Sequence, residues 1–172
     1  SFTLIFVGFF SCGFQLAFIT AHFPAFISEA SSPIQPKSLV SLVCNSTASL
    51  GALSIAIIGF FNIAGSIAAG ALGKNYSKKY LLSLIYTGRT LASLAFIMFP
   101  ITPFTVIIFS MVMGSLWLAT VPLTSGIVGQ IYGVQYMGTL YGIVFFSHQL
   151  GSFVGVWLGG IFYDKYGSYD IV

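Results

Sequence analysis

The stretch MGTLYGIVFFSHQLGSFVGVWLGGIFY, residues 137–163, decides how the rest of the chain is interpreted. As a helix rising about 1.5 Å per residue it would reach about 40 Å, enough to cross the hydrocarbon core of a bilayer and both interfaces. Gly151, Gly155 and Gly159 recur at every fourth residue, and such a stripe of small residues lets a neighbouring helix backbone approach closely. The stretch therefore predicts a transmembrane helix that packs tightly against another helix.

Two polar side chains, His148 and Gln149, lie at the centre of this predicted span. His148 lies three residues before Gly151, so we expect it at the edge of the glycine stripe, pointing into protein. An ionisable side chain near the middle of a bilayer is costly, which favours a functional role for His148 and, more weakly, for Gln149. The alternative is a neutral histidine that forms a structural hydrogen bond between two helices.

The composition indicates an integral membrane protein. Hydrophobic residues make up 57% of the 172 residues, charged residues make up 5%, and the mean hydropathy is +0.99. Soluble domains carry about 25% charged residues. The net charge of +3 is concentrated in one loop, so we attribute it to topology and expect no nucleic-acid partner. The chain opens SFTLIFVGFF, with no initiating Met and no signal-peptide pattern, so we expect a fragment.

The first predicted span covers residues 2–27, and we expect it to end where Pro24 and neighbouring polar residues interrupt the apolar run. Gln15 and His22 lie on a small and polar face of this helix. Gln15 falls near the middle of the span, which makes it the better candidate for a solute contact, and His22 near the far end is a candidate for a gate. A structural hydrogen bond between helices explains either residue equally well.

The second predicted span covers residues 47–73 and follows a loop, 28–46, in which a short interfacial helix is expected around 39–43. Within this span Asn62 shares a face with Gly59 and other small residues, so we expect it to be buried. Intramembrane asparagines commonly bond one helix to another, and that role is favoured over a solute contact.

The third and fourth predicted spans cover residues 80–99 and 104–129. Arg89 interrupts the third span at mid-depth. It could attract an anionic solute, extend along its own stem to the membrane surface, or pair with a group outside this chain. In the fourth span Pro122 cannot donate a backbone hydrogen bond, so we expect a kink and a free carbonyl near Leu118.

The distribution of charge predicts the orientation of the five spans. Half of the six Lys and Arg residues lie in residues 74–79, which places this turn and the turn at 130–136 in the cytoplasm. The acids Glu29, Asp164 and Asp170 all fall on the outer side. Because no carboxylate lies within a predicted span, the chain is not expected to be an aspartyl intramembrane protease.

No enzymatic chemistry is predicted. The sequence has no HExxH metalloprotease motif, no phosphate-binding loop and no nucleophile elbow, so we predict no catalytic residues. Cys12 lies inside the first apolar run and Cys44 lies near the start of the second, a placement that indicates neither a disulfide nor a metal site. We therefore expect no cofactor and no bound metal.

Four strings in the chain resemble the carboxyl-terminal half of a major facilitator superfamily transporter, in the branch of monocarboxylate porters and oxalate/formate antiporters. They are CGFQLAFITAHFPAF at 12–26, IIGFFNIAGSIAAGALG at 57–73, KKYLLSLIYTGR at 78–89 and LYGIVFFSHQLGSFVGVWLGGIFYDKYGSYD at 140–170. The resemblance covers most of the chain. Two features depart from the family pattern: GALGKN has Lys74 and Asn75 where the family has an acidic and then a basic residue, and the second span carries no charge.

The resemblance implies an all-α membrane protein whose five transmembrane helices correspond to helices seven to eleven of twelve. The twelfth helix and an amino-terminal six-helix half would be partners outside this chain. The first and fourth spans would line the solute cavity and the third would be peripheral, which favours Gln15 and His148 over Arg89 as solute contacts. The implied function is secondary active transport of a small organic solute, a monocarboxylate-like anion, across the plasma membrane by alternating access.

Two other functions stay open at this point. A channel is the first, although channels usually display repeated rings of polar residues, which the sequence lacks. A non-transporting assembly subunit or receptor is the second. If the chain belongs to a carrier, His148 could couple proton and anion movement, because a histidine changes charge near a pH of about 6.5. Symport and antiport, with protons or a counter-substrate, are both compatible with this hypothesis.

Overall fold

The computed structural model describes residues 2–30 and 47–167, with side chains for 2–27 and 50–167. These residues form α1 (Phe2–Ala30), α3 (Thr47–Asn75), α4 (Lys78–Met98), α5 (Pro103–Trp117), α6 (Thr120–Tyr132) and α7 (Val134–Tyr166). Because α5 and α6 follow each other within one apolar segment, the described residues contain five segments long and apolar enough to cross a membrane. The prediction of an all-α protein with five spans is confirmed.

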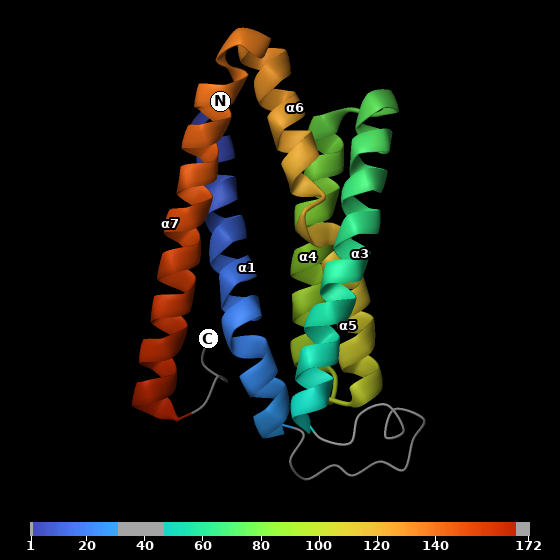
Figure 1. The fold of residues 1–172 in the computed structure, drawn as a ribbon, viewed down its shortest axis with the longest axis vertical. Helices are drawn as coiled ribbons and strands as arrows, with labels where there is room; N and C mark the ends of the chain where they lie inside the picture. Colours follow the sequence, from blue (N-terminus) through green and yellow to red (C-terminus); the bar gives the residue numbers. More distant parts are fainter. Residues whose placement is uncertain (1, 31–46, 168–172) are drawn as a thin grey trace.

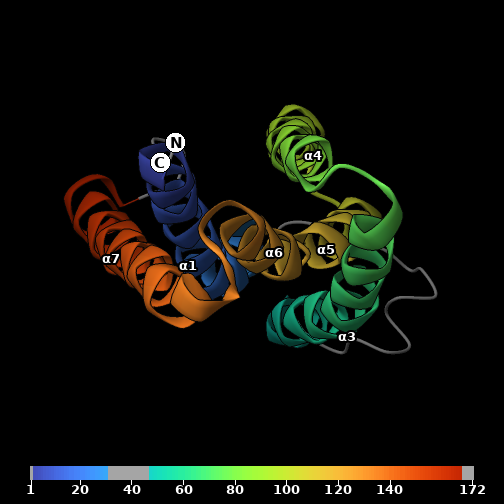
Figure 2. The ribbon, with the colours of Figure 1, turned by 90° about the horizontal axis from the view of Figure 1, so that it is seen from above.

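The helices run side by side along the long axis of the molecule and alternate in direction from one span to the next (Figure 1). α1 and α7 form one group, and α3, α4 and α5 form a second group (Figures 1 and 2). α6 lies between the two groups at one end. The most extensive helix pairings are α1 with α7 and α3 with α5. The molecule is thus built from two groups of helices, each held by one extensive helix pairing, and α1 contacts α3 of the other group.

The contact between α1 and α7 depends on the glycine stripe. Gly151, Gly155 and Gly159 are all buried. A Cβ atom added at Gly151 or Gly155 would strike the backbone of α1, and one added at Gly159 would strike the ring of His22. The sequence therefore brings α7 into direct backbone contact with α1, as small residues do between helices in membranes.

Serine hydroxyls add hydrogen bonds to the same contact. Ser147 donates to the carbonyl of Phe6 at 3.0 Å, and Ser152 donates to the carbonyl of Gly13 at 3.2 Å. Gly13 itself leaves no room for a Cβ, because the carbonyl of His148 lies against it. Small residues on both helices, rather than on α7 alone, make this close approach possible.

α3 and α5 also meet through glycines. Gly65 lies against the backbone of Ser115, and Gly114 lies against the backbone of Ile58. The small-residue face predicted for this span includes Gly59, but Gly59 is exposed, and a Cβ added there would have no neighbouring atom within 4 Å. Ala69 and Gly73 of the predicted face are buried, so the packing face of α3 matches the prediction in this half of the helix and differs from it at Gly59.

The largest buried apolar cluster fills the end of the molecule where the carboxyl-terminal part of α1 meets α3 and α5. Its members are Ile19, Phe23, Ile27, Leu50, Ile58, Val106, Phe109, Met113 and Trp117. Gly51 lets the start of α3 approach Pro24 of α1 at this end. Pro24 was predicted to help end the first helix, but α1 continues through it to Ala30. A proline removes one backbone hydrogen bond from a helix, and here Pro24 packs directly against Gly51 of α3.

The kink predicted in the fourth span is present as a break between α5 and α6. The carbonyl of Leu118, predicted to be free, accepts a hydrogen bond from the Val121 N–H at 3.0 Å. The Leu118 N–H is bound by Asn62, whose Oδ1 accepts it at 2.8 Å. Asn62 is half-buried rather than buried as predicted, and it joins α3 to the broken span. The break therefore leaves neither backbone group of Leu118 unpaired.

Local sequence signals account for the turns beside these helices. Thr102 caps the start of α5, accepting a hydrogen bond from the Thr105 N–H at 3.2 Å, and Pro103 follows at the first helical position. Gly133, between α6 and α7, has φ +85°, a conformation that favours glycine. The interfacial helix expected around residues 39–43 lies outside the described residues.

Candidate functional site

Polar side chains gather where α4 faces α1, near the middle of both helices. Three hydrogen bonds cross this contact: Tyr86 to Gly8, Arg89 to Cys12, and Gln15 to Ser93. We call these three pairs the α1–α4 ladder. The rungs recur at steps of three and four residues on each helix, the spacing that places side chains on one helix face. Since α1 and α4 run in the same direction (Figure 1), successive rungs follow the membrane normal.

The ladder is made by side chains rather than by close backbones. The Tyr86 hydroxyl donates to the Gly8 carbonyl at 3.2 Å, and Gln15 Nε2 donates to Ser93 Oγ at 3.0 Å. By contrast with the α1–α7 contact, α1 and α4 share too few backbone contacts to rank among the main helix pairings. Long polar side chains therefore span a distance that the helices themselves do not close.

Arg89 is the central rung and is almost completely buried, with 1% of its surface exposed. One terminal nitrogen donates to Cys12 Sγ at 2.9 Å, whereas the buried Nε has no hydrogen-bond partner among the described residues. Cys12 is 2% exposed. A guanidinium carries five N–H donors and stays charged, so this burial leaves a cation bound to a weak acceptor. The expectation that Arg89 could extend to the membrane surface is wrong, because the side chain lies inside the protein.

His148 lies on the α7 side of the same region. Its ring stacks on Phe145 with centroids 5.6 Å apart and packs against Phe9 at 5.8 Å. The Nδ1 atom of His148 is buried and has no hydrogen-bond partner within the ranges that the structure describes, and the same is true of the Tyr141 hydroxyl. Two unpaired polar atoms of α7 therefore accompany the unpaired Nε of α4.

No carboxylate of the described ranges lies close to Arg89. Glu29 follows Cys12 by 17 residues along α1, about 25 Å of helix, and Asp164 follows His148 by 16 residues along α7, about 24 Å. Burying a charge without a counter-ion is costly. The α1–α4 ladder thus contains a buried positive charge that the described part of the chain does not neutralise.

The remaining predicted residues lie elsewhere. His22 Nε2 pairs with the Val156 carbonyl at 3.2 Å and belongs to the α1–α7 contact. Asn62 binds the break between α5 and α6, and Gln149 is exposed. Of the six predicted residues, the structure brings together Gln15, Arg89 and His148, and it separates His22, Asn62 and Gln149 from them.

Sequence reasoning missed Cys12, Tyr86 and Ser93 as members of this region. Their signal was present, because residues 86, 89 and 93 repeat at helical spacing on the third span and match residues 8, 12 and 15 on the first. The third span was expected to be peripheral, and so its polar face was not matched to a partner helix.

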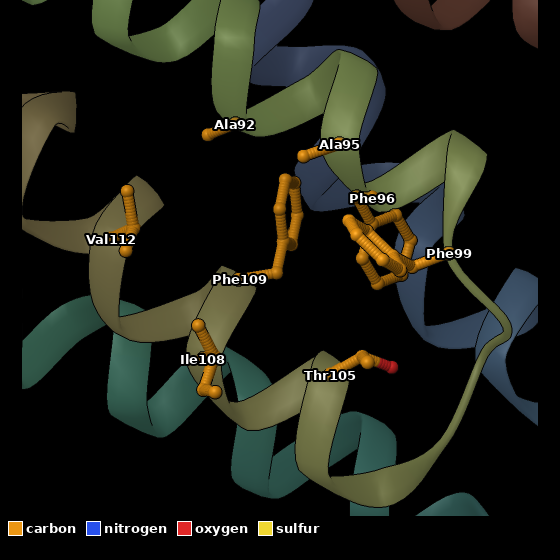
Figure 3. Close-up of a pocket in the computed structure, with 8 residues that line it drawn as sticks. All are labelled: Ala92, Ala95, Phe96, Phe99, Thr105, Ile108, Phe109 and Val112. Atoms are coloured by element: carbon orange, nitrogen blue, oxygen red, sulfur yellow. The ribbon is translucent and has the colours of Figure 1, made fainter.

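A separate cavity of about 380 Å³ lies between α4 and α5 (Figure 3). Its lining consists of Ala92, Ala95, Phe96, Phe99, Thr105, Ile108, Phe109 and Val112. The one hydroxyl among them, on Thr105, already donates within its own turn, where the Thr102 and Pro100 carbonyls lie at 2.9 and 3.1 Å. The cavity therefore offers no free polar group to a polar solute. Within the ranges described, no three side chains gather as a metal site would require.

Comparison with known proteins gives one informative match. No protein-family model matches the chain. The chain is 29% identical, over 175 aligned residues, to a Bacillus subtilis (strain 168) protein described as an uncharacterized MFS-type transporter, YcxA. The match covers 98% of this chain and 39% of that protein, so the chain spans about two-fifths of its relative's length. Together with the five apolar helices, this similarity supports an integral membrane protein that resembles MFS-type transporters.

Proposed function

We propose that the chain is part of a secondary transporter that moves a small organic solute, a monocarboxylate-like anion, across a membrane by alternating access. Similarity to an MFS-type transporter along the whole chain supports transport. The buried charge of Arg89 supports an anion as the solute. An amino-terminal six-helix half and a twelfth helix would complete the carrier.

The chemistry of Arg89 supports a carboxylate as the solute. A guanidinium matches a carboxylate through two parallel N–H···O hydrogen bonds, and hydrogen bonds between ionised groups are roughly twice as strong as neutral ones. Arg89 has a buried Nε without a partner and no nearby carboxylate in the described part of the chain. A carboxylate solute would supply the missing charge and the missing acceptor together.

The two groups of helices suggest how access could alternate. α1 and α7 are joined by backbone contacts, whereas α1 and α4 are joined through side chains. These are the side chains of the ladder and the ring of Phe96, which packs against Phe23 and Phe26. A carrier needs an interface that can part without breaking the fold, and packed helices move as rigid bodies. We propose that the α1–α7 pair moves as one unit relative to α4.

The orientation follows from the same proposal. The turns between α3 and α4 and between α6 and α7 lie at one end of the molecule (Figure 1). Because residues 74–79 carry three lysines, we propose that this end, with residues 130–136, faces the cytoplasm of a cell bounded by the plasma membrane.

Flux through the complete protein that carries this chain tests the proposal. Reconstituted in vesicles, it should take up labelled propionate with saturation and should show counterflow. Arg89→Gln should raise the propionate concentration that gives half-maximal uptake by about 10- to 100-fold, because it removes a hydrogen bond to a charged group. Uptake without saturation would favour a channel, and no solute-dependent flux would favour an assembly subunit or receptor. The 172-residue chain alone should not transport, since the site of such a carrier lies between two halves.

A second experiment addresses coupling to protons. His148→Gln keeps a hydrogen-bonding side chain but removes titration. We expect this variant of the complete carrier to bind the solute while the dependence of uptake on pH becomes flatter. We expect His148→Ala to lose both solute binding and the pH dependence of uptake. A wild-type pH profile in His148→Gln would leave His148 as a structural residue of the α1–α7 contact.

A further inference from the structure

We infer that Cys12 holds the Arg89 guanidinium while the solute site is empty, and that a bound carboxylate takes the place of the thiol. The inference rests on the proposed function and deepens it, since it assigns the anion site to the contact between α1 and α4. Cys12 would therefore compete with the solute for Arg89, and its own strength as an acceptor would set the affinity of the site.

The geometry of the pair supports an exchange of partners. Arg89 donates to Cys12 Sγ at 2.9 Å, and sulfur is a weak acceptor. Both side chains are at most 2% exposed, and the cavity of Figure 3 lies between α4 and α5 instead. An anion that reaches Arg89 must therefore displace an existing neighbour. The thiol is the neighbour that a carboxylate outcompetes, because a carboxylate oxygen accepts from a guanidinium far more strongly.

The surroundings of the pair define the class of anion. Tyr86 of α4 and both His148 and Tyr141 of α7 are the titratable side chains beside Cys12 and Arg89. The Tyr141 hydroxyl and His148 Nδ1 have no partner in the described ranges and could bond a carboxylate or a substituent next to it. Arg89 is the one guanidinium of the ladder, and aromatic rings enclose the α7 side. These features fit a small anion with a single carboxylate.

Acetate binding to the chain in lipid nanodiscs tests the inference without requiring flux. Acetate should raise the thermal unfolding temperature in a saturable way, since a ligand of the folded state stabilises it, and acetamide, its neutral analogue, should not. Arg89→Gln should abolish the effect. Cys12→Ala should bind acetate about fivefold more tightly, the factor that one hydrogen bond of ordinary strength represents. Cys12→Ser, which keeps an acceptor, should not bind more tightly.

Ser66→Ala is the matched control, because it removes a hydroxyl that bonds only to the backbone of its own helix, α3, outside the ladder; its acetate affinity should equal that of the wild type. Equal affinities in Cys12→Ala and the wild type would overturn the competition between thiol and anion. If acetate stabilised the chain but not the complete protein, Arg89 would be paired there with a protein carboxylate, and the inference would fall. Saturable transport that does not depend on Arg89 would also overturn it while leaving the proposed function standing.

Discussion

Two of the neighbours of α1, α7 and α4, contact it in opposite ways. Toward α7 its backbone lies against glycines, and serine hydroxyls donate into its carbonyls. Toward α4 it makes the three rungs of the ladder through side chains, one of them charged. The first contact leaves no room for an added side chain, because a Cβ atom at Gly13, Gly151 or Gly155 would strike the backbone of the facing helix. The second contact can lengthen by side-chain rotation.

The difference separates what stabilises the fold from what could move within it. Helix association in a membrane depends on close packing of small residues, which is lost as soon as the helices separate. A long side chain can keep a hydrogen bond over a range of helix positions. We therefore expect stability to depend mainly on the α1–α7 contact and function to depend mainly on the α1–α4 ladder.

The largest effect is expected from Gly155→Leu, which should destabilise the protein by about 3 kcal/mol through overpacking against α1. Thermal unfolding in detergent and the yield of folded protein would show the loss. Gly160→Leu is the matched control, since no atom lies within 4 Å of a Cβ at that position, and it should unfold at the wild-type temperature or above. Equal stability of the two variants would place the stripe against lipid.

Arg89→Met should leave stability unchanged or raise it, by about 1 to 2 kcal/mol at most, because an apolar side chain of similar length avoids burying a charge. Thermal unfolding measures this directly. Lys165→Met, at the exposed end of α7, is the control and should shift stability by less than about 0.5 kcal/mol. A strong loss of stability in Arg89→Met would show that the ladder stabilises the fold and would contradict its assignment to transport.

Asn62→Ala should cost about 1 kcal/mol, because the Leu118 N–H at the break loses its acceptor while part of the site remains exposed. Ser66→Ala, one turn further along α3, removes only a bond to that helix's own backbone and serves as the control. Thermal unfolding of both variants, with hydrogen exchange at Leu118, compares them. Unchanged exchange at Leu118 in Asn62→Ala would contradict the role assigned to Asn62.

The smallest effects on stability are expected from two serine substitutions, one in each of these contacts of α1. Ser93→Ala removes a rung of the ladder and Ser152→Ala removes a bond between α7 and α1. Each should cost about 0.6 kcal/mol, the average for such bonds in membranes. If α4 moves relative to the α1–α7 pair, only Ser93→Ala should change the rate of solute uptake in the complete carrier. Equal changes in uptake rate would show that both contacts move.

The fold could be predicted from the sequence because each membrane span is recognisable from its length and its apolar composition, and both are properties of the sequence itself. The break near Leu118 was predictable for the same reason, since Pro122 limits the backbone wherever it lies. The packing face of α3 was predictable only in part, at Ala69 and Gly73 but not at Gly59. Gly59 and Gly65 are equally small, and only the position of α5 decides which of them is buried.

The candidate site was predictable in part. His148 was identified from its depth and from its place beside the glycine stripe, and the structure puts it near Cys12. The pairing of Arg89 with Cys12 was not predictable, because a cysteine in an apolar run resembles an ordinary core residue. Recognising it requires knowing that α4 lies beside α1 in the same direction, which is a property of the folded chain.

The hydrogen bond from Leu118 to Asn62 has a consequence for the order of assembly. Exposed to lipid, the Leu118 N–H would cost several kcal/mol, because the hydrocarbon core offers no acceptor. Its acceptor lies on α3, which precedes α5 in the chain and would enter the membrane first during synthesis. The fourth span should therefore leave the insertion machinery together with the second, so that helix pairing begins before the chain is complete.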